Sequence, residues 1–301
     1  MNTAMTHKSV LLQEVIESLN LHKGGTYVDG TFGAGGHSRQ IARAISHEGH
    51  LISFDQDETV FNEAVVRAIS EDTRFTHVVE NFGNAKAALV KLDIQHIDGA
   101  MFDLGLSSTQ LEESGRGFSF QRDEPLWMTF KHSPKEEDVT AIDIVNHWSE
   151  ESIATILKGF GDERFARSIA RGIVEARSTG EIRTTSELVE IIRTNTPGWY
   201  QHGRTHFATR TFQALRMAVN DELGVIEKGI RGVFELLSPG GRISVISFHS
   251  IEDRLVKQLF RDMNNEGLVE MITKKPIVPS DEELKENPRA RSAKLRVIQK
   301  L

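Results

Sequence analysis

The chain of 301 residues has no cysteine at all. This absence excludes disulfides, a thiolate nucleophile and zinc sites built from cysteine, and it is typical of the reducing cytoplasm, where we expect the protein. The sequence also lacks any apolar run near the roughly 18 residues of a membrane span. The N-terminus lacks the apolar core of a signal peptide. We therefore expect no contact with a membrane.

An excess of basic charge is missing too, because the formal net charge is −7 at pH 7. This balance argues against a protein that coats nucleic acid, so any such contact would need a local basic patch. Hydrophobic residues make up 39% and charged residues 26% of the chain, which suffices for a sizeable core and excludes wholesale disorder. Composition thus indicates a globular protein and leaves its chemistry open.

The first third of the chain alternates between strand-like and helix-like segments. Regular alternation of this kind is typical of a parallel sheet with right-handed crossovers. After an opening helix at 8–19, strands are predicted at 26–30, 50–55, 75–80 and 97–105, with helices at 37–45, 57–69 and 84–92 between them.

The alternation stops after the fourth strand, and 111–215 shows only helix-like segments, such as 163–177 and 186–193. Beyond it the pattern predicts a helix at 222–237, a turn at 238–241, a strand at 241–250 and a hairpin-like edge from 268–273 and 293–298. We predict an α/β fold: a doubly wound domain, 1–110 and 216–301, with an all-helical insertion at 111–215 after the fourth strand.

The stretch TYVDGTFGAGGHS (26–38) joins the first strand to a helix through a glycine-rich loop. Gly33, Gly35 and Gly36 allow a ligand to approach the backbone amides and the positive end of the helix. Asp55 ends the second strand, where such folds accept hydrogen bonds from a ribose diol. The loop therefore fits either a dinucleotide or an adenosine-containing ligand without phosphates.

Asp29, at the end of the first strand, distinguishes these two ligands. A pyrophosphate beside a fixed carboxylate would be repelled, which disfavours an NAD-linked oxidoreductase. S-adenosyl-L-methionine carries a sulfonium and an ammonium group, and a carboxylate favours both. The alternative is that Asp29 only accepts hydrogen bonds from the loop.

Asp103 ends the fourth strand at the same edge of the sheet, where ligands of open α/β sheets bind. A carboxylate there can orient an amine that is to be methylated, because it accepts the amine hydrogens and directs the lone pair. Binding the cofactor or capping a turn is an equal alternative for Asp103.

Polar residues gather just after the predicted fifth strand, in SFHSIEDRLVK (247–257). His249 and Arg254 are candidates for a rim that faces the substrate. The alternative is a helix cap, with Ser250 as N-cap and Asp253 three residues later. No second histidine lies nearby at ligand spacing, so we predict no metal.

Basic residues form local patches, including Arg164, Arg167 and Arg171 in the helix at 163–177, and Arg210 further on. Such patches suit phosphate contacts. The insertion nevertheless contains 13 Lys/Arg against 16 Asp/Glu. A solvated helix face is therefore the better interpretation of each patch alone.

Seven blocks spread over the chain resemble, in order, the bacterial small-subunit rRNA cytosine-N4 methyltransferase family (RsmH, formerly MraW). The blocks are HKSVLLQEVIESL, VDGTFGAGGHS, DLGLSSTQLEESGRGFSF, GDERFARSIARGIVEAR, ATRTFQALRMAVNDEL, SPGGRISVISFHSIEDRLVK and NPRARSAKLR.

This resemblance implies a Rossmann-like methyltransferase domain with a helical insertion that recognises substrate. It implies methyl transfer from S-adenosyl-L-methionine to N4 of a cytidine in the decoding region of 16S rRNA, with the rRNA or the 30S subunit as partner and a homodimer as a further expectation. The cofactor contacts that it implies are Gly35, Gly36, His37, Asp55, Phe82, Asp103 and Gln110.

The segment QRDEPLWMTF (121–130) departs from the family pattern, with Glu124 in place of glycine and Trp127 in place of aspartate. The departure motivates an alternative function, a non-catalytic cofactor-binding factor of ribosome assembly. A base that is to be methylated must leave its stack, and aromatic side chains often hold it. Phe118, Phe120 and Trp127 are candidates, with core packing as the alternative for the two phenylalanines.

Overall fold

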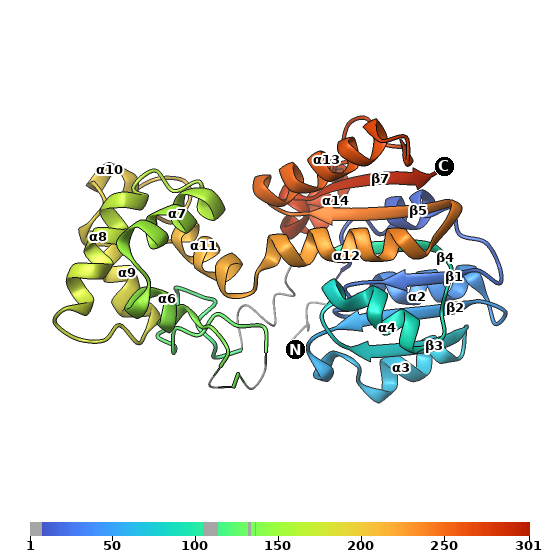
Figure 1. Cartoon of the computed structure of the whole chain (residues 1–301), viewed down its shortest axis with the longest axis horizontal. Coiled ribbons are helices and arrows are strands. Elements are labelled where there is room, and N and C mark those ends of the chain that lie inside the picture. The colour runs from blue at the N-terminus through green and yellow to red at the C-terminus, as the bar shows by residue number, and fades with distance from the viewer. Residues whose placement is uncertain (1–7, 105–113, 132–133, 136) are drawn as a thin grey trace. The chain divides into compact units, whose positions relative to one another are not determined.

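The computed structural model describes residues 8–104, 114–131, 134–135 and 137–301, and the chain separates into two compact units (Figure 1). Unit 1 consists of Met1–Gly105 and Leu223–Leu301, and unit 2 of Leu106–Glu222. Unit 1 contains the sheet, and unit 2 is inserted into it after the fourth strand.

Unit 1 is built on a seven-stranded sheet with the order β3-β2-β1-β4-β5-β7-β6. Neighbours from β3 to β5 pair in parallel, whereas β7 pairs antiparallel with both β5 and β6. The strands are β1 (Thr26–Asp29), β2 (His50–Asp55), β3 (Arg74–Val79), β4 (Ile97–Asp103), β5 (Leu237–Ser247), β6 (Val269–Met271) and β7 (Lys294–Lys300).

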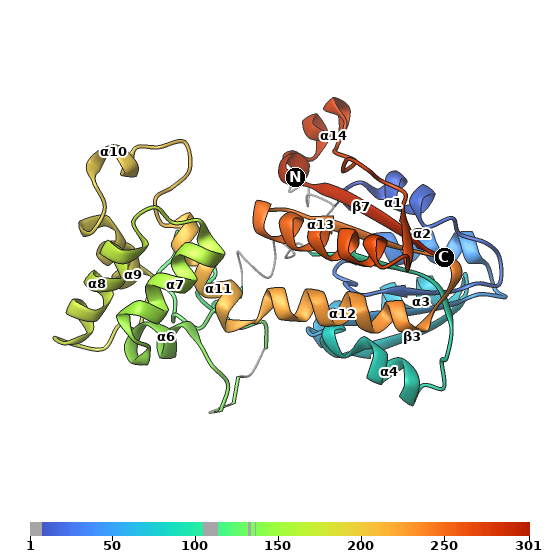
Figure 2. The ribbon, with the colours of Figure 1, turned by 45° about the horizontal axis from the view of Figure 1, so that its top comes forward.

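Helices cover both faces of this sheet, because successive strand residues point to opposite faces. Val28 of β1 packs with α4, α12 and α13 on one face, and its neighbour Tyr27 packs with α1, α2 and α3 on the other (Figure 2). The helices are α1 (Leu12–Ser18), α2 (Gly36–Ile45), α3 (Glu63–Ser70), α4 (Ala85–Lys91), α12 (Glu222–Leu236), α13 (Ser250–Asn265) and α14 (Asp281–Glu286), with 3-10 turns η1 (Glu58–Val60), η2 (Phe82–Asn84) and η3 (Pro288–Ser292).

Unit 2 has its own core of aliphatic and aromatic side chains, including Leu126, Ile169 and Leu215. In its described part, the one β-type pairing is an isolated bridge between Pro125 and Thr184. Its helices are α6 (Ala141–His147), α7 (Glu150–Gly161), α8 (Ala166–Arg177), α9 (Thr185–Thr194), α10 (Gly198–Gln201) and α11 (Thr209–Val219).

The predicted α/β class is confirmed, and three local predictions need correction. The predicted helix at 57–69 is divided, because the Asn62 side chain caps a new helix by accepting from the Val65 amide at 3.1 Å. The predicted turn at 238–241 lies within β5, at a register shift against β4. The last two strands do pair, but β7 lies between β5 and β6, so that β6 alone of these two strands lies at an edge of the sheet. Among the described residues, no helix is both long and apolar enough to cross a membrane.

Candidate cofactor site

The glycine-rich loop of unit 1 runs from the end of β1 to the start of α2. Gly35 is the N-cap of α2 with φ 73°, and Gly36 is its first residue. A Cβ on Gly36 would lie 1.9 Å from the Ser9 hydroxyl oxygen, so any other residue here would have to displace that hydroxyl. The glycines thus leave the loop without side chains of its own at the positive end of a ten-residue helix.

Asp29, the last residue of β1, is completely buried. Its carboxylate accepts hydrogen bonds from the Thr31 amide at 3.0 Å and from the Ser38 hydroxyl at 2.6 Å. Burial raises the pKa of Asp29 to about 6, and the nearby Asp55 charge acts in the same direction. Asp29 therefore fastens the loop by accepting these hydrogen bonds. Its predicted role in cofactor binding stays a prediction.

Asp55, the last residue of β2, is tied to the same loop. Its two oxygens accept hydrogen bonds from the Gly33 amide at 2.9 Å and from the Asp57 amide at 3.0 Å. Burial raises the pKa of Asp55 despite these hydrogen bonds. The carboxylate therefore joins the loop to the end of β2, and its contact with a ribose diol stays a prediction.

Asp103 ends β4, and its backbone amide donates to the Thr31 hydroxyl oxygen at 2.6 Å. His37 is buried beside it, with Nδ1 3.8 Å from an oxygen of the Asp103 carboxylate. The His37 Nε2 lies 3.1 Å from the Val10 carbonyl oxygen, which can only accept, so Nε2 carries the proton. The other ring nitrogen, Nδ1, faces Asp103.

Three carboxylates accordingly end three neighbouring strands at one edge of the sheet. In the parallel register Asp29 stands beside Ser53 and Met101, and Asp55 and Asp103 follow those residues by two positions. Burial raises the pKa of Asp29 and of Asp55, which means that their negative charge is costly at this edge. A cationic ligand would reduce that cost and is therefore favoured. Pyrophosphate would meet repulsion at this edge.

Two other residues that were predicted to contact the cofactor follow β3 and β4 in the sequence. Phe82 begins η2 after β3, and its partly exposed ring lies 5.3 Å from the ring of Phe102 on β4. It is therefore held near the end of the sheet, and its cofactor contact stays a prediction. Gln110 lies outside the described residues.

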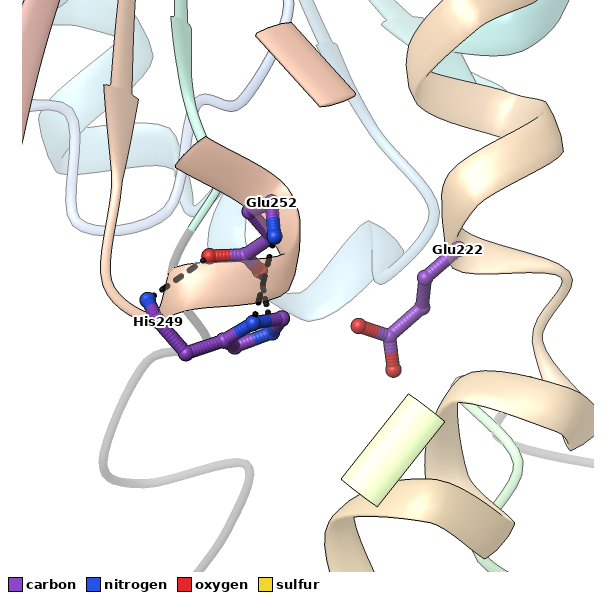
Figure 3. Close-up of side chains that lie close together, drawn as sticks. All are labelled: Glu222, His249 and Glu252. Atoms are coloured by element: carbon purple, nitrogen blue, oxygen red, sulfur yellow. Dashed lines mark hydrogen bonds and ion pairs between the residues drawn. The ribbon is translucent and has the colours of Figure 1, made fainter. Parts of the chain in front are cut away.

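The turn between β5 and α13 forms a capping box, but one residue earlier than predicted. His249 is the N-cap, and Glu252 returns the hydrogen bond by accepting from the His249 amide at 3.2 Å (Figure 3). Asp253 turns away from this box, pairing with Arg296 at 2.7 Å and Lys294 at 2.9 Å. Burial would raise the pKa of Asp253, but these cations lower it overall. Arg254 is exposed, and its substrate role stays a prediction, as does that of His249.

The two phenylalanines predicted to hold the base are packed within unit 2. Phe118 is 8% exposed and stacks on Phe130, which favours the packing alternative, and its substrate contact stays a prediction. Phe120 is partly buried and stacks on His206 with the ring centroids 4.3 Å apart, which also favours packing. Trp127 is partly exposed. Arg210 donates to the Asp162 carbonyl oxygen at 2.9 Å.

The unusual segment 121–130 is integrated into unit 2. Glu124 is buried, and its carboxylate accepts a hydrogen bond from the Gly117 amide at 2.9 Å. Its own backbone amide donates to the Thr185 hydroxyl oxygen at 3.1 Å. Asn220 closes the other end, accepting from the Phe130 amide and donating to the Met128 carbonyl oxygen. The departures from the family pattern are therefore accommodated by specific contacts.

The sequence did not single out the hydroxyl groups that hold the site together. The Thr31 hydroxyl oxygen accepts a hydrogen bond from the Asp103 amide. The Ser38 hydroxyl donates to Asp29 and lies 2.8 Å from the Ser53 hydroxyl oxygen. Small hydroxyl residues flanking a glycine loop were the available signal, but such residues are common in every turn.

The fold and this loop define a Rossmann-like domain for a cationic, adenosine-containing cofactor. The sequence model of the MraW methylase family matches residues 4–301, and the chain belongs to this family. Proteins named ribosomal RNA small subunit methyltransferase H are similar to it: that of Brevibacillus brevis is 44% identical, with 98% of each chain covered. That of Clostridium botulinum is 45% identical, covering 98% of this chain and 99% of its own. Membership confirms the predicted family and the predicted cofactor, S-adenosyl-L-methionine.

Proposed function

We propose that the protein methylates N4 of a cytidine in the decoding region of 16S rRNA. The carboxylates at the ends of β1, β2 and β4 support the cofactor, because they favour a cationic methyl donor over a phosphate. The names of the relatives support rRNA of the small subunit as substrate.

S-adenosyl-L-methionine supplies an electrophilic methyl group on a sulfonium. The N4 nitrogen forms the new carbon–nitrogen bond as the carbon–sulfur bond breaks, and one N4 proton then leaves to water. In the proposed mechanism the Asp103 carboxylate accepts the amine hydrogens and directs the lone pair towards the methyl group. The His37 ring lies beside Asp103, with Nδ1 3.8 Å from that carboxylate.

The test uses purified protein, labelled S-adenosyl-L-methionine and small subunits from cells that lack this gene. Digestion to nucleosides and mass spectrometry should reveal labelled N4-methylcytidine. Asp103→Asn should lower the rate about 100-fold, because one acceptor becomes a donor and the amine is misdirected. Calorimetry would report cofactor affinity separately. Absence of label with every subunit preparation, despite measured cofactor binding, would refute the proposal.

The alternative, a non-catalytic assembly factor, makes a different prediction for the same residue. Cells that carry Asp103→Ala would keep all growth and assembly phenotypes, whereas disruption of the fold would not. Under the proposed function the variant cells lack N4-methylcytidine, as rRNA nucleoside analysis would show.

A further inference from the structure

Unit 2 carries an exposed aromatic cluster that the cofactor site does not use. Trp199 in α10 is 64% exposed, against 46% for Val139 in the same unit. Its ring centroid lies 5.8 Å from that of Phe165 and 6.0 Å from that of Tyr200. Both contacts are inclined by more than 60°, so neither neighbour stacks flat on the indole.

A buried carboxylate fixes both neighbours of Trp199. Glu163 is completely buried, and its two oxygens accept from the Tyr200 hydroxyl at 2.7 Å and from the Phe165 amide at 2.9 Å. A group of this kind is costly to bury, so its hydrogen bonds hold the Tyr200 ring and the Phe165 backbone in place. The exposed indole therefore stands on a rigid support.

The chain around this cluster is basic. Residues 191–220 contain no Asp or Glu, although the whole chain has 43 of them, and they include four arginines. Arg164 and Arg210 lie close enough to Tyr200 to act on its phenol through their charge. Arg164 and Arg204 are exposed, and neither forms an ion pair with any described residue.

We propose that the Trp199 patch, defined as Arg164, Phe165, Trp199 and Tyr200 with Arg204 four residues further along the chain, binds a single-stranded segment of the rRNA. One base stacks on the Trp199 indole, and the arginines contact backbone phosphates. Exposed aromatic rings beside arginines are the features with which proteins hold unpaired nucleotides. Protein interfaces are also rich in Trp, Tyr and Arg, but a stretch of 30 residues with four arginines and no Asp or Glu favours a polyanion such as RNA. This inference rests on the proposed function for the identity of the RNA.

The experiment measures the affinity of the full-length protein for a short fluorescein-labelled single-stranded oligoribonucleotide by anisotropy. Trp199→Ala should weaken binding about 5- to 100-fold through loss of a stacked base. Trp199→Phe should restore most of the affinity, because it keeps an aromatic face. Val139→Ala, an exposed hydrophobic residue elsewhere in unit 2, should have no effect.

An abasic chain of the same length separates stacking from charge. It should bind weakly and equally to wild type and Trp199→Ala, whereas Arg164→Gln and Arg204→Gln should each reduce the salt dependence of RNA binding by a slope of about 0.7. Equal RNA affinity of Trp199→Ala and wild type would overturn the proposal. So would a change only in oligomeric state, measured by sedimentation, which would indicate a protein contact.

The two proposals fail separately. Trp199-dependent binding without any methylation of small subunits would refute the proposed function and leave the patch intact. Methylation that Trp199→Ala leaves at the wild-type rate and KM, together with unchanged RNA affinity, would refute the patch alone.

Discussion

Among the described residues, Asp29 in unit 1 and Glu163 in unit 2 are carboxylates that are completely buried, and their surroundings differ. Asp29 of unit 1 accepts from a hydroxyl and an amide and lies near the charge of Asp55. Glu163 of unit 2 accepts from a hydroxyl and an amide as well, but arginines lie close to its partner Tyr200. The Asp29 carboxylate has no cationic side chain from the described part of the chain beside it and would favour a cationic ligand. The Glu163 carboxylate instead fixes the side chains around it.

Replacing Asp29 gives the largest expected effect on this comparison. Burial raises its pKa to about 6 from 3.8, so the folded state binds the proton more tightly than the unfolded chain does. The free energy of unfolding therefore decreases as pH rises from about 4 to about 6, and the cost of about 3 kcal/mol persists at higher pH. Asp29→Asn should stabilise unit 1 by up to that amount at neutral pH, measured by urea unfolding.

Two further measurements sharpen this prediction. The gain should vanish below about pH 4, where the wild-type carboxyl is protonated in both states. Asparagine can keep both hydrogen bonds, because the Ser38–Ser53 hydroxyl pair can reverse its direction. Affinity for S-adenosyl-L-methionine should nevertheless fall in the variant. A variant with unchanged cofactor affinity would show that the Asp29 charge plays no part in binding.

The two tyrosines of the chain, one in each unit, offer a matched pair. The Tyr200 hydroxyl donates to the buried Glu163 carboxylate, whereas the Tyr27 hydroxyl accepts from the His22 amide at 3.2 Å. Tyr200→Phe leaves a buried charge short of a donor and should destabilise unit 2 by about 2 kcal/mol. Tyr27→Phe should cost about 1 kcal/mol or less in unit 1.

Hydrogen exchange read by mass spectrometry assigns each loss to its unit. Glu163→Gln in the Tyr200→Phe background should recover part of the lost stability, because the buried charge is then gone. Equal losses for the two tyrosine variants would show that Glu163 is no more dependent on its partner than a neutral amide is.

Periodicity and strand-end position carried most of the sequence prediction. Residues at strand ends, such as Asp29, Asp55 and Asp103, share one edge in any parallel sheet, so their grouping was predictable. The burial of Asp29 was not, because it depends on Ser38 and Thr31 closing over the carboxylate. The positions of the aromatic side chains in unit 2 were harder still to predict. The Phe118 ring, for example, stacks on that of Phe130, twelve residues further along the chain.

The smallest expected effects concern two helix caps, one chosen from each unit. Thr184 caps α9 in unit 2 and His249 caps α13 in unit 1, each in a capping box. Alanine at either position should cost about 1 kcal/mol of stability. Thr184→Ser and His249→Asn should restore it, because both replacements keep a side-chain acceptor for the helix amide.

Activity distinguishes the two caps even where their stabilities match. Thr184→Ala should leave methyl transfer unchanged at a temperature where the protein stays folded. His249→Asn keeps the cap but removes the imidazole, so it tests the predicted rim that faces the substrate. A stable His249→Asn variant with a raised KM for small subunits would establish that His249 contacts substrate. Wild-type kinetics in that variant would show that His249 acts only as a helix cap. Arg254 would then be the remaining candidate for the rim that faces the substrate.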